Sequence, residues 1–232
     1  MPAPRKILIV LHQEHSTPGR VGRLLRAHGC ALDVRRPRFG EKLPETMEEH
    51  DGAVIFGGPM SAYDEEEYIR REIDWINVPL SENKPFLGIC LGAQMLAKTL
   101  GGHVWKHPEG RVEIGYYPID VQPGACDMRH APFPGHVYHW HRDGFDLPRG
   151  ATLLASGGDF PVQACRVGAN AYGIQFHPEV TYAMMCRWTT LAAERMHGGG
   201  AQPREAHLAG WFQHDAAMER WADAFLARWA AA

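Results

Sequence analysis

The fold of this chain is decided by the stretch Lys84-Pro85-Phe86-Leu87-Gly88-Ile89-Cys90-Leu91-Gly92-Ala93-Gln94. An apolar run suited to a buried strand ends at Cys90, and a helix-forming run, 93–100, begins directly after it. Gly88 and Gly92 flank the cysteine two residues away on each side, which is typical of a tight strand–turn–helix elbow that presents a nucleophile. Glycine suits both positions because a side chain there would collide with neighbouring backbone. Such an elbow places the sulfur at the positive end of the following helix, which favours the reactive thiolate.

A second short strand, 172–176, runs into His177-Pro178-Glu179. A thiolate nucleophile needs a base within hydrogen-bond reach, and that base needs an acceptor on its other nitrogen. His177 and Glu179 can fill these roles, because alternate residues of an extended chain lie on one side and Pro178 stiffens the link. The alternative is a structural cysteine, since free cysteine is among the most buried residue types.

Taken together, GICLGAQ (88–94) and GIQFHPE (173–179) resemble the two signature motifs of class I (triad-type) glutamine amidotransferases. The segment 55–61 is similar to that family's oxyanion loop, and the segment 139–148 is similar to its substrate-side loop. The resemblance covers nearly the whole chain to about residue 190. Motifs such as His-Trp-His (139–141) and Phe-Asp-Leu-Pro (145–148) are most similar in sequence to those of stand-alone members described as GMP-synthase-like amidotransferases.

The resemblance implies a set of site residues in three groups. They are a catalytic triad of Cys90, His177 and Glu179, an oxyanion hole from the N–H groups of Gly58 and Leu91, and substrate-binding residues Gln94, Trp140, His141 and Arg142. Two of these residues also have a purely structural interpretation: residues 57–59 form a simple turn, and Gln94 is an exposed polar residue of the helix. The implied reaction is attack of the cysteine on the side-chain amide of glutamine, which releases ammonia and leaves a thioester that water hydrolyses.

One position departs from the family pattern. The family commonly has His-Gly-Asp in the substrate-side loop, whereas this chain has His141-Arg142-Asp143. A side chain at this position either narrows the pocket or supplies a guanidinium for an anionic group of the substrate. Strict specificity for glutamine is therefore in doubt from the sequence alone.

The order of strands and helices predicts an α/β fold. Apolar strands near 7–11, 31–34 and 53–56 alternate with helices, which indicates a doubly wound, mostly parallel, flavodoxin-like sheet. After 101–102 several short extended runs predict an antiparallel excursion from that sheet. We expect an amidotransferase-like domain over 1–197, a glycine-rich linker over 198–203 and a helical C-terminal extension over 204–232.

Two clusters of titratable residues raise the question of a metal site. The acidic run within 63–76 is expected to be a solvated helix, since acidic residues suit a helix N-terminus. The histidines at 130, 136, 139 and 141 fit no established zinc spacing, so packed or tuned histidines are expected and no metal or other cofactor is predicted. Five widely spaced cysteines, Cys90 among them, do not form a disulfide framework, and the other four are expected to be small apolar fillers.

Composition excludes several partners. The 232 residues carry a formal net charge of −3, which gives no case for nucleic acid or an anionic membrane. No apolar run approaches the length of a membrane span, and the N-terminus lacks a signal-peptide pattern, so a cytoplasmic location is expected.

The sequence leaves three functions open. The chain either supplies ammonia to a separate synthetase subunit or hydrolyses γ-glutamyl compounds by itself, because it contains no P-loop and no spare length for an acceptor domain. A non-catalytic binding module on the same fold is a third alternative. The aromatic residues of the C-terminal tail are expected to pack on the domain itself, with a contact to a partner or to a second copy as the other reading.

Overall fold

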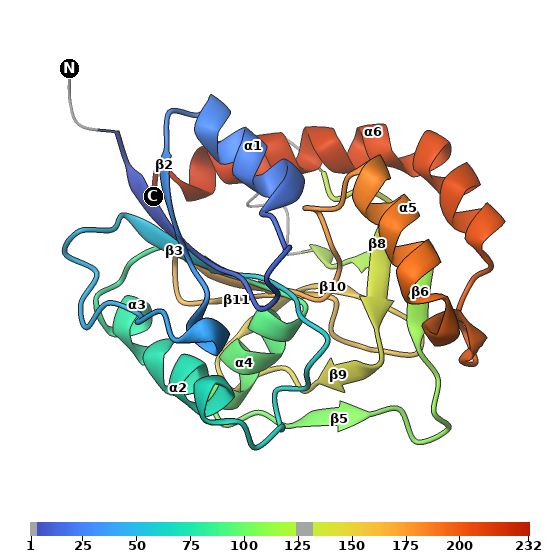
Figure 1. The fold of residues 1–232 in the computed structure, drawn as a ribbon, viewed down its shortest axis with the longest axis horizontal. Coiled ribbons are helices and arrows are strands. Elements are labelled where there is room, and N and C mark those ends of the chain that lie inside the picture. Colours follow the sequence, from blue (N-terminus) through green and yellow to red (C-terminus); the bar gives the residue numbers. More distant parts are fainter. Residues whose placement is uncertain (1–3, 124–131) are drawn as a thin grey trace.

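A central sheet runs through the computed structural model, which describes residues 4–123 and 132–232 (Figure 1). Within these residues it has eight strands in the order β2-β1-β3-β4-β12-β11-β10-β7. Their bounds are β2 Ala31–Arg35, β1 Lys6–Val10, β3 Gly52–Ile55, β4 Phe86–Ile89, β12 Ala171–Ile174, β11 Ala164–Val167, β10 Thr152–Ser156 and β7 Asp120–Val121. The first five run parallel and the last three pair antiparallel, so the predicted mostly parallel sheet with an antiparallel excursion is confirmed.

Two smaller strand pairs stand beside the sheet. The first joins β5 (Val104–Lys106) to β9 (Asp143–Phe145), and the second joins β6 (Glu113–Pro118) to β8 (His136–His141). Both pairs are antiparallel, and both bring residues of the predicted substrate-side loop toward the carboxyl ends of the parallel strands.

Helices cover both faces of the sheet because its central strands are apolar on both sides. Ile7 and Ile9 of β1 pack in one cluster with α1 (Gly19–Ala27) and α6 (Arg204–Trp229). Leu8 and Val10 pack in another cluster with α2 (Glu67–Trp75) and α4 (Leu91–Thr99). Alternate residues of a strand point to opposite faces, so one short strand is enough to join both layers. The other helices among the described residues are α3 (Asn77–Ser81), α5 (Tyr182–Leu191) and 3₁₀ turns at Pro37–Phe39 and Ala193–His197.

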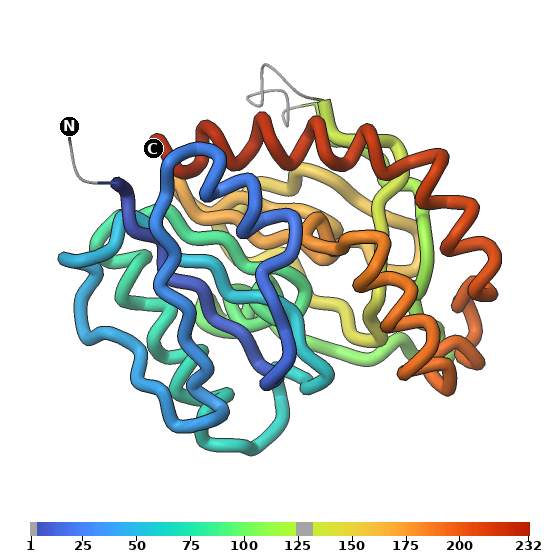
Figure 2. Tube along the Cα trace, turned by 45° about the horizontal axis from the view of Figure 1, so that its top comes forward, coloured from blue at the N-terminus to red at the C-terminus, as the bar shows by residue number. Residues whose placement is uncertain are grey.

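The C-terminal segment forms one long helix, α6, which crosses the molecule past α1 (Figure 2). Trp221, Phe225 and Trp229 are buried in the same cluster as β1 and α1, in agreement with the expected packing of the tail on its own domain. Phe212, in contrast, is 80% exposed. The preceding segment 198–203 lies against β6, where the Gln202 N–H donates to the Ile114 carbonyl. The division of the chain into domain, linker and extension stays a prediction.

Among the described residues, no helix combines the length and the apolar character that crossing a bilayer requires.

The elbow between β4 and α4 has the geometry that the sequence predicted. Cys90 is the N-cap of α4 and has a φ of 51°, a left-handed conformation that a side-chain-bearing residue rarely adopts. A Cβ added at Gly88 would lie 2.4 Å from the Gly92 carbonyl oxygen, and one added at Gly92 would lie 2.2 Å from the Ile55 oxygen. Both neighbours are backbone atoms that cannot move aside. The turn therefore requires glycine at both positions and holds Cys90 at the carboxyl edge of the sheet.

We expect Gly92→Ala to destabilise the protein by about 3 kcal/mol or more, because the new methyl group meets backbone of β3. Gly158→Ala is the matched control, since a Cβ at Gly158 meets nothing within 4 Å. Its effect should stay within about 0.5 kcal/mol. Urea denaturation of the three proteins measures both changes, and equal stability of the two variants would contradict the requirement for glycine in the elbow.

Candidate active site

The structure brings Cys90, His177 and Glu179 together from two elements at the carboxyl edge of the sheet. Cys90 follows β4, and His177 and Glu179 follow the neighbouring parallel strand β12. His177 Nδ1 lies 2.7 Å from Glu179 Oε1, which leaves Nε2 for the cysteine. Gly57 lies over both groups: a Cβ there would be 2.9 Å from His177 Cε1 and 3.4 Å from Cys90 Cβ. The sulfur, the imidazole and the carboxylate are thus neighbours in a row, and within the described residues His177 Nε2 makes no hydrogen bond.

The surroundings of His177 favour its protonated form. Burial by itself would lower the pKa of this histidine. The neighbouring Glu179 and Cys90 outweigh burial and raise the pKa to about 10. A protonated ring beside Cys90 can donate a proton to a leaving group.

Two backbone N–H groups lie where the sequence analysis expected an oxyanion hole. Gly58 and Leu91 both line the pocket that contains Cys90. Within the described residues, neither of these N–H groups donates to a protein acceptor. Leu91 is the first residue of α4, so its N–H is one of the free donors at a helix N-terminus. Both N–H groups are thus without a protein acceptor at the edge of this pocket.

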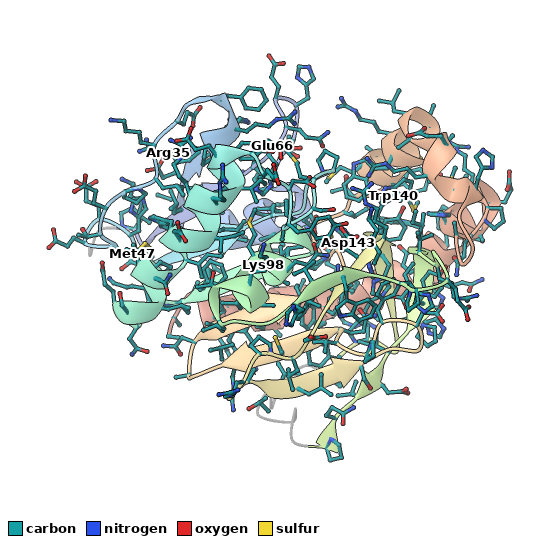
Figure 3. All side chains as sticks on the ribbon, turned by 90° about the horizontal axis from the view of Figure 1, so that it is seen from below. Arg35, Met47, Glu66, Lys98, Trp140 and Asp143 are labelled. Atoms are coloured by element: carbon teal, nitrogen blue, oxygen red, sulfur yellow. The ribbon has the colours of Figure 1, made fainter. Side chains whose placement is uncertain are left out.

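The pocket over Cys90 also collects the residues expected to bind substrate. Its lining includes Gln94, Trp140, His141 and Arg142, and it adds Arg195 from the 3₁₀ turn after α5, which the sequence analysis did not single out. Figure 3 places Trp140 and Asp143, which also lines the pocket, on the side of the molecule away from Arg35 and Met47. All the predicted site residues thus meet in or beside one pocket.

Gln94 is not the exposed helix residue of the purely structural interpretation, since only 2% of its surface is accessible to solvent. Its Nε2 donates to the Asp143 carbonyl at 3.1 Å and to Gln175 Oε1 at 3.3 Å. Gln175 in turn lies with Nε2 3.5 Å from the Cys90 sulfur. The side chain of Gln94 therefore ties the elbow helix to the substrate-side loop.

Arg142, the departure from the family pattern, lies at the pocket with half of its side chain exposed. Its Nη2 donates to Ser61 Oγ at 3.3 Å. Ser61 Oγ itself donates to the carboxylate of the buried Asp143, which also accepts from Tyr63 at 3.1 Å. The guanidinium is thus oriented beside the pocket, with its Nε 3.9 Å from Asp143 Oδ2.

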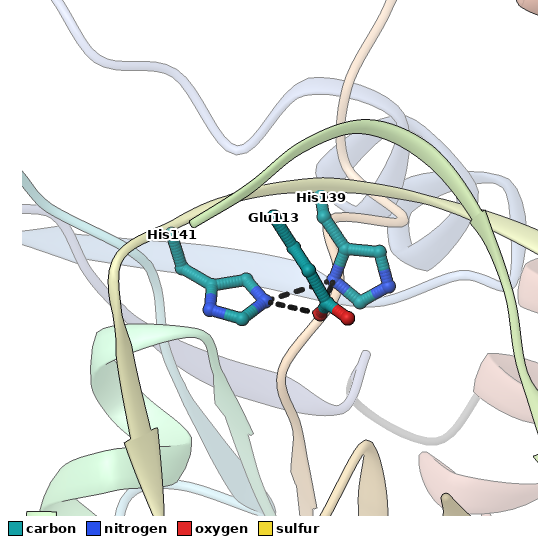
Figure 4. A group of neighbouring side chains, drawn as sticks. All are labelled: Glu113, His139 and His141. Atoms are coloured by element: carbon teal, nitrogen blue, oxygen red, sulfur yellow. Dashed lines mark hydrogen bonds and ion pairs between the residues drawn. The ribbon is translucent and has the colours of Figure 1, made fainter. Parts of the chain in front are cut away.

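Figure 4 shows a buried group of Glu113, His139 and His141 behind the pocket. His141 Nε2 lies 3.0 Å from Glu113 Oε2 and 3.1 Å from His139 Nδ1, and the three ligand atoms all lie within 4.8 Å of one another. The donor set could hold a divalent cation, yet Gln163 Nε2 already donates to the same Glu113 oxygen at 2.8 Å. His139 Nε2 has no hydrogen-bond partner within the described residues, whereas a metal-bound histidine normally anchors its second nitrogen. We therefore describe the group as a hydrogen-bond network that supports His141.

The other histidines and cysteines take structural positions. His136 stacks on His214 of α6 with 4.4 Å between the ring centroids, away from His139 and His141. Burial raises the pKa of the Cys165 thiol to about 12 and also raises that of Cys30, which suits inert packing. His130 and Cys126 lie outside the described residues.

The acidic helix corrects one expectation. The acidic run within 63–76 was expected to be a solvated helix, but its Glu72, in α2, is completely buried. Its Oε2 lies 2.7 Å from Nε2 of His12, which is also completely buried and which the sequence analysis did not consider. The signal was present in the spacing, because position 72 shares the apolar stripe of Tyr68, Ile69 and Trp75.

We expect Cys90→Ser to lower the pKa of His177 from about 10 toward the ordinary histidine value, because the charge of Cys90 is one of the causes that raise it. NMR titration of the ring resonances measures this change. The raised pKa also favours the folded state below the ordinary pKa of histidine, and that contribution is lost as the pH rises toward 10. An unchanged His177 titration in Cys90→Ser would mean that the sulfur and the ring do not interact.

Comparisons with known proteins agree with this geometry. A family model described as "Glutamine amidotransferase class-I" matches residues 14–185. The glutamine amidotransferase-like protein YfeJ of Salmonella typhimurium is 33% identical over 184 residues, which is 76% of each chain. The glutamine-hydrolyzing GMP synthase subunit of Sulfurisphaera tokodaii is 33% identical over 61% of this chain and 74% of its own, and gamma-glutamyl peptidase 5 of Arabidopsis thaliana is 31% identical over 57% and 55%.

The fold comparison covers almost the entire chain. The crystal structure of a glutamine amidotransferase from Thermotoga maritima superposes with a TM-score of 0.87, at 32% identity, over 98% of this chain and 99% of the other. The family match thus spans the elbow, and the structural match spans nearly all of the sheet and the helices around it. The chain belongs to the class I glutamine amidotransferase family.

Proposed function

We propose that this protein hydrolyses the side-chain amide of glutamine or of a γ-glutamyl amide through a thioester on Cys90. The observation that carries the proposal is the row formed by Cys90, His177 and Glu179 beneath a pocket with two free N–H groups. Each member lies in the order that nucleophilic catalysis requires: nucleophile, base and orienting acceptor. Membership of a family of amidohydrolases and amidotransferases supports the same chemistry.

In the first half of the reaction, the thiolate of Cys90 attacks the amide carbon and forms the C–S bond. The carbonyl oxygen becomes an oxyanion, which the N–H groups of Gly58 and Leu91 stabilise; one such donor contributes about 3 kcal/mol. The C–N bond then breaks, and the His177 imidazolium gives its proton to the leaving nitrogen. Ammonia, or an amine from a γ-glutamyl amide, leaves the site.

In the second half, His177 takes a proton from water, which attacks the thioester carbon and displaces the thiolate. Glu179 holds Nδ1 at 2.7 Å, so the ring presents Nε2 in both halves. It also stabilises the imidazolium when it forms. The products are glutamate and the regenerated thiolate.

The pocket supplies a place for the α-amino-acid end of the substrate. We assign this role to Gln94, Trp140, His141 and Arg142, which line the pocket with Cys90. The guanidinium of Arg142 suits a carboxylate, since arginine pairs with carboxylates through several hydrogen bonds. A side chain of this size where the family commonly has glycine favours a substrate whose anionic group reaches it.

Two relatives support different uses of the reaction. The resemblance to the GMP synthase subunit of Sulfurisphaera tokodaii supports delivery of ammonia to a separate synthetase subunit, and the resemblance to gamma-glutamyl peptidase 5 supports hydrolysis of γ-glutamyl compounds by the chain alone. Both uses begin with cleavage of a γ-glutamyl C–N bond. The cytoplasmic location, a synthetase partner and a homo-oligomer remain predictions.

The proposal is tested with glutamine, γ-glutamyl peptides and γ-glutamyl amines, with release of ammonia or amine followed for each. Cys90→Ser should lower kcat by at least about 10³-fold, because it removes the nucleophile. Glu179→Gln should lower kcat by about 10²- to 10⁴-fold, because it removes the acceptor that selects the tautomer of His177. Turnover of glutamine alone favours ammonia supply, and turnover of peptides or amines favours the stand-alone hydrolase.

Cys186→Ser is the matched control, since Cys186 is a free and partly exposed thiol outside the site. It should keep full activity. Absence of turnover with every member of the panel, or equal activity of Cys90→Ser and Cys186→Ser, would contradict the proposal and favour a binding module.

A further inference from the structure

A buried histidine holds the loop that carries the Gly58 N–H. His12 follows β1 and is completely enclosed, as is its partner Glu72 on α2. His12 Nδ1 lies 3.1 Å from the Gly57 carbonyl oxygen, and its Nε2 lies 2.7 Å from Glu72 Oε2. One ring therefore connects the central strand, the acidic helix and the glycine loop. The catalytic mechanism above makes no use of this pair.

The hydrogen at Nδ1 follows from the chemistry of the two partners. A peptide carbonyl only accepts hydrogen bonds, so Nδ1 must carry the hydrogen that it shares with Gly57. The second proton lies between Nε2 and Glu72, either on the ring as an imidazolium or on the carboxyl group. In both cases the Nδ1–H donates to the Gly57 oxygen, and Glu72 secures the tautomer as Glu179 does for His177.

The orientation of one peptide group then decides where the Gly58 N–H points. The carbonyl of Gly57 and the N–H of Gly58 belong to the same planar trans peptide, so they point in opposite directions. His12 holds the carbonyl toward the interior, and Gly58 lines the pocket. The N–H is thereby directed away from His12. A hydrogen bond to the carbonyl also polarises the peptide and strengthens its N–H as a donor.

Close packing of Gly58 against His12 also restricts the loop. A Cβ at Gly58 would lie 3.0 Å from His12 Cβ and 3.2 Å from its Cγ, so the glycine rests directly on the histidine. At the far end of the loop, Ser61 donates to the buried carboxylate of Asp143. The loop is anchored at both ends, and His12 anchors the end that carries the oxyanion donor.

We propose that His12, supported by Glu72, is a positioning residue that orients and polarises the Gly57–Gly58 peptide as half of the oxyanion hole. The inference rests on the proposed amide hydrolysis and adds two residues to its machinery. His12 touches neither the substrate nor the sulfur: it acts through the peptide. The consequence is that the hole is preassembled within this chain.

Two variants test the proposal as a matched pair. His12→Leu and His12→Asn both leave Glu72 without its partner, but only asparagine retains an N–H donor near the position of Nδ1. We expect His12→Leu to lower kcat by about 10- to 100-fold, with KM changed less than about threefold, because the donor acts on the transition state. His12→Asn should recover most of the lost kcat.

A second reaction of the same sulfur separates positioning from structural damage. Alkylation of Cys90 by iodoacetamide displaces iodide at a saturated carbon and develops no oxyanion. Its rate depends on the thiolate, so it should differ by less than about twofold between His12→Leu and the unmodified sequence. An equal fall in turnover and alkylation, or a His12→Asn variant as slow as His12→Leu, would overturn the inference.

Crystal structures of the two variants decide the matter even if no glutamyl amide is turned over. If the unmodified protein turned over none of these substrates, the proposed function would be refuted, but the crystal structures of the two variants would still test the role of His12. We expect the Gly57 carbonyl to keep its direction in His12→Asn and to change it in His12→Leu. A carbonyl that keeps its direction in both variants would show that His12 does not orient it.

Discussion

The structure depends on one backbone contact, the approach of Gly92 to the Ile55 carbonyl of the neighbouring strand. A Cβ at Gly92 would lie 2.2 Å from that oxygen, and one at Gly88 would lie 2.4 Å from the Gly92 oxygen. Because the turn is this tight, β4 passes into α4 with Cys90 held in a left-handed conformation. Strain of this kind persists only where the surrounding structure imposes it, here through the buried parallel strands on both sides.

Two buried histidine–carboxylate pairs lie around that turn. His177 and Glu179 lie on the side of the sulfur, and His12 and Glu72 lie beneath the glycine loop. In each pair the histidine lies between a carboxylate and a second group, which is Cys90 for His177 and the Gly57 carbonyl for His12. Pairs of this kind cost desolvation free energy unless their hydrogen bonds are well formed, so they are weak evidence for stability and stronger evidence for a function that needs orientation.

Motifs predicted much of the site because they report local geometry. The glycine spacing around Cys90 and the alternation of His177 and Glu179 are properties of a few consecutive residues, and the structure has the geometry that both imply. Glu72 was assigned to a solvated face because the run around it is acidic, although its position on the apolar stripe of α2 pointed inward. Arg195 gave no signal at all, since it joins the pocket from a segment distant from every motif.

The sequence by itself determined the elbow, the mostly parallel sheet and the identity of the candidate nucleophile and its histidine, because each depends on short-range sterics and apolar patterning. Tertiary structure decided what lies behind them. His12 pairs with Glu72 across 60 positions, and Gln94 bonds to Asp143 across 49. Such partners are chosen by the order of strands and the side on which each helix packs, and no local pattern encodes that arrangement. The same reason explains why the sequence left two placements open for the aromatic tail, whereas its long helix packs against β1 and α1 in the folded chain.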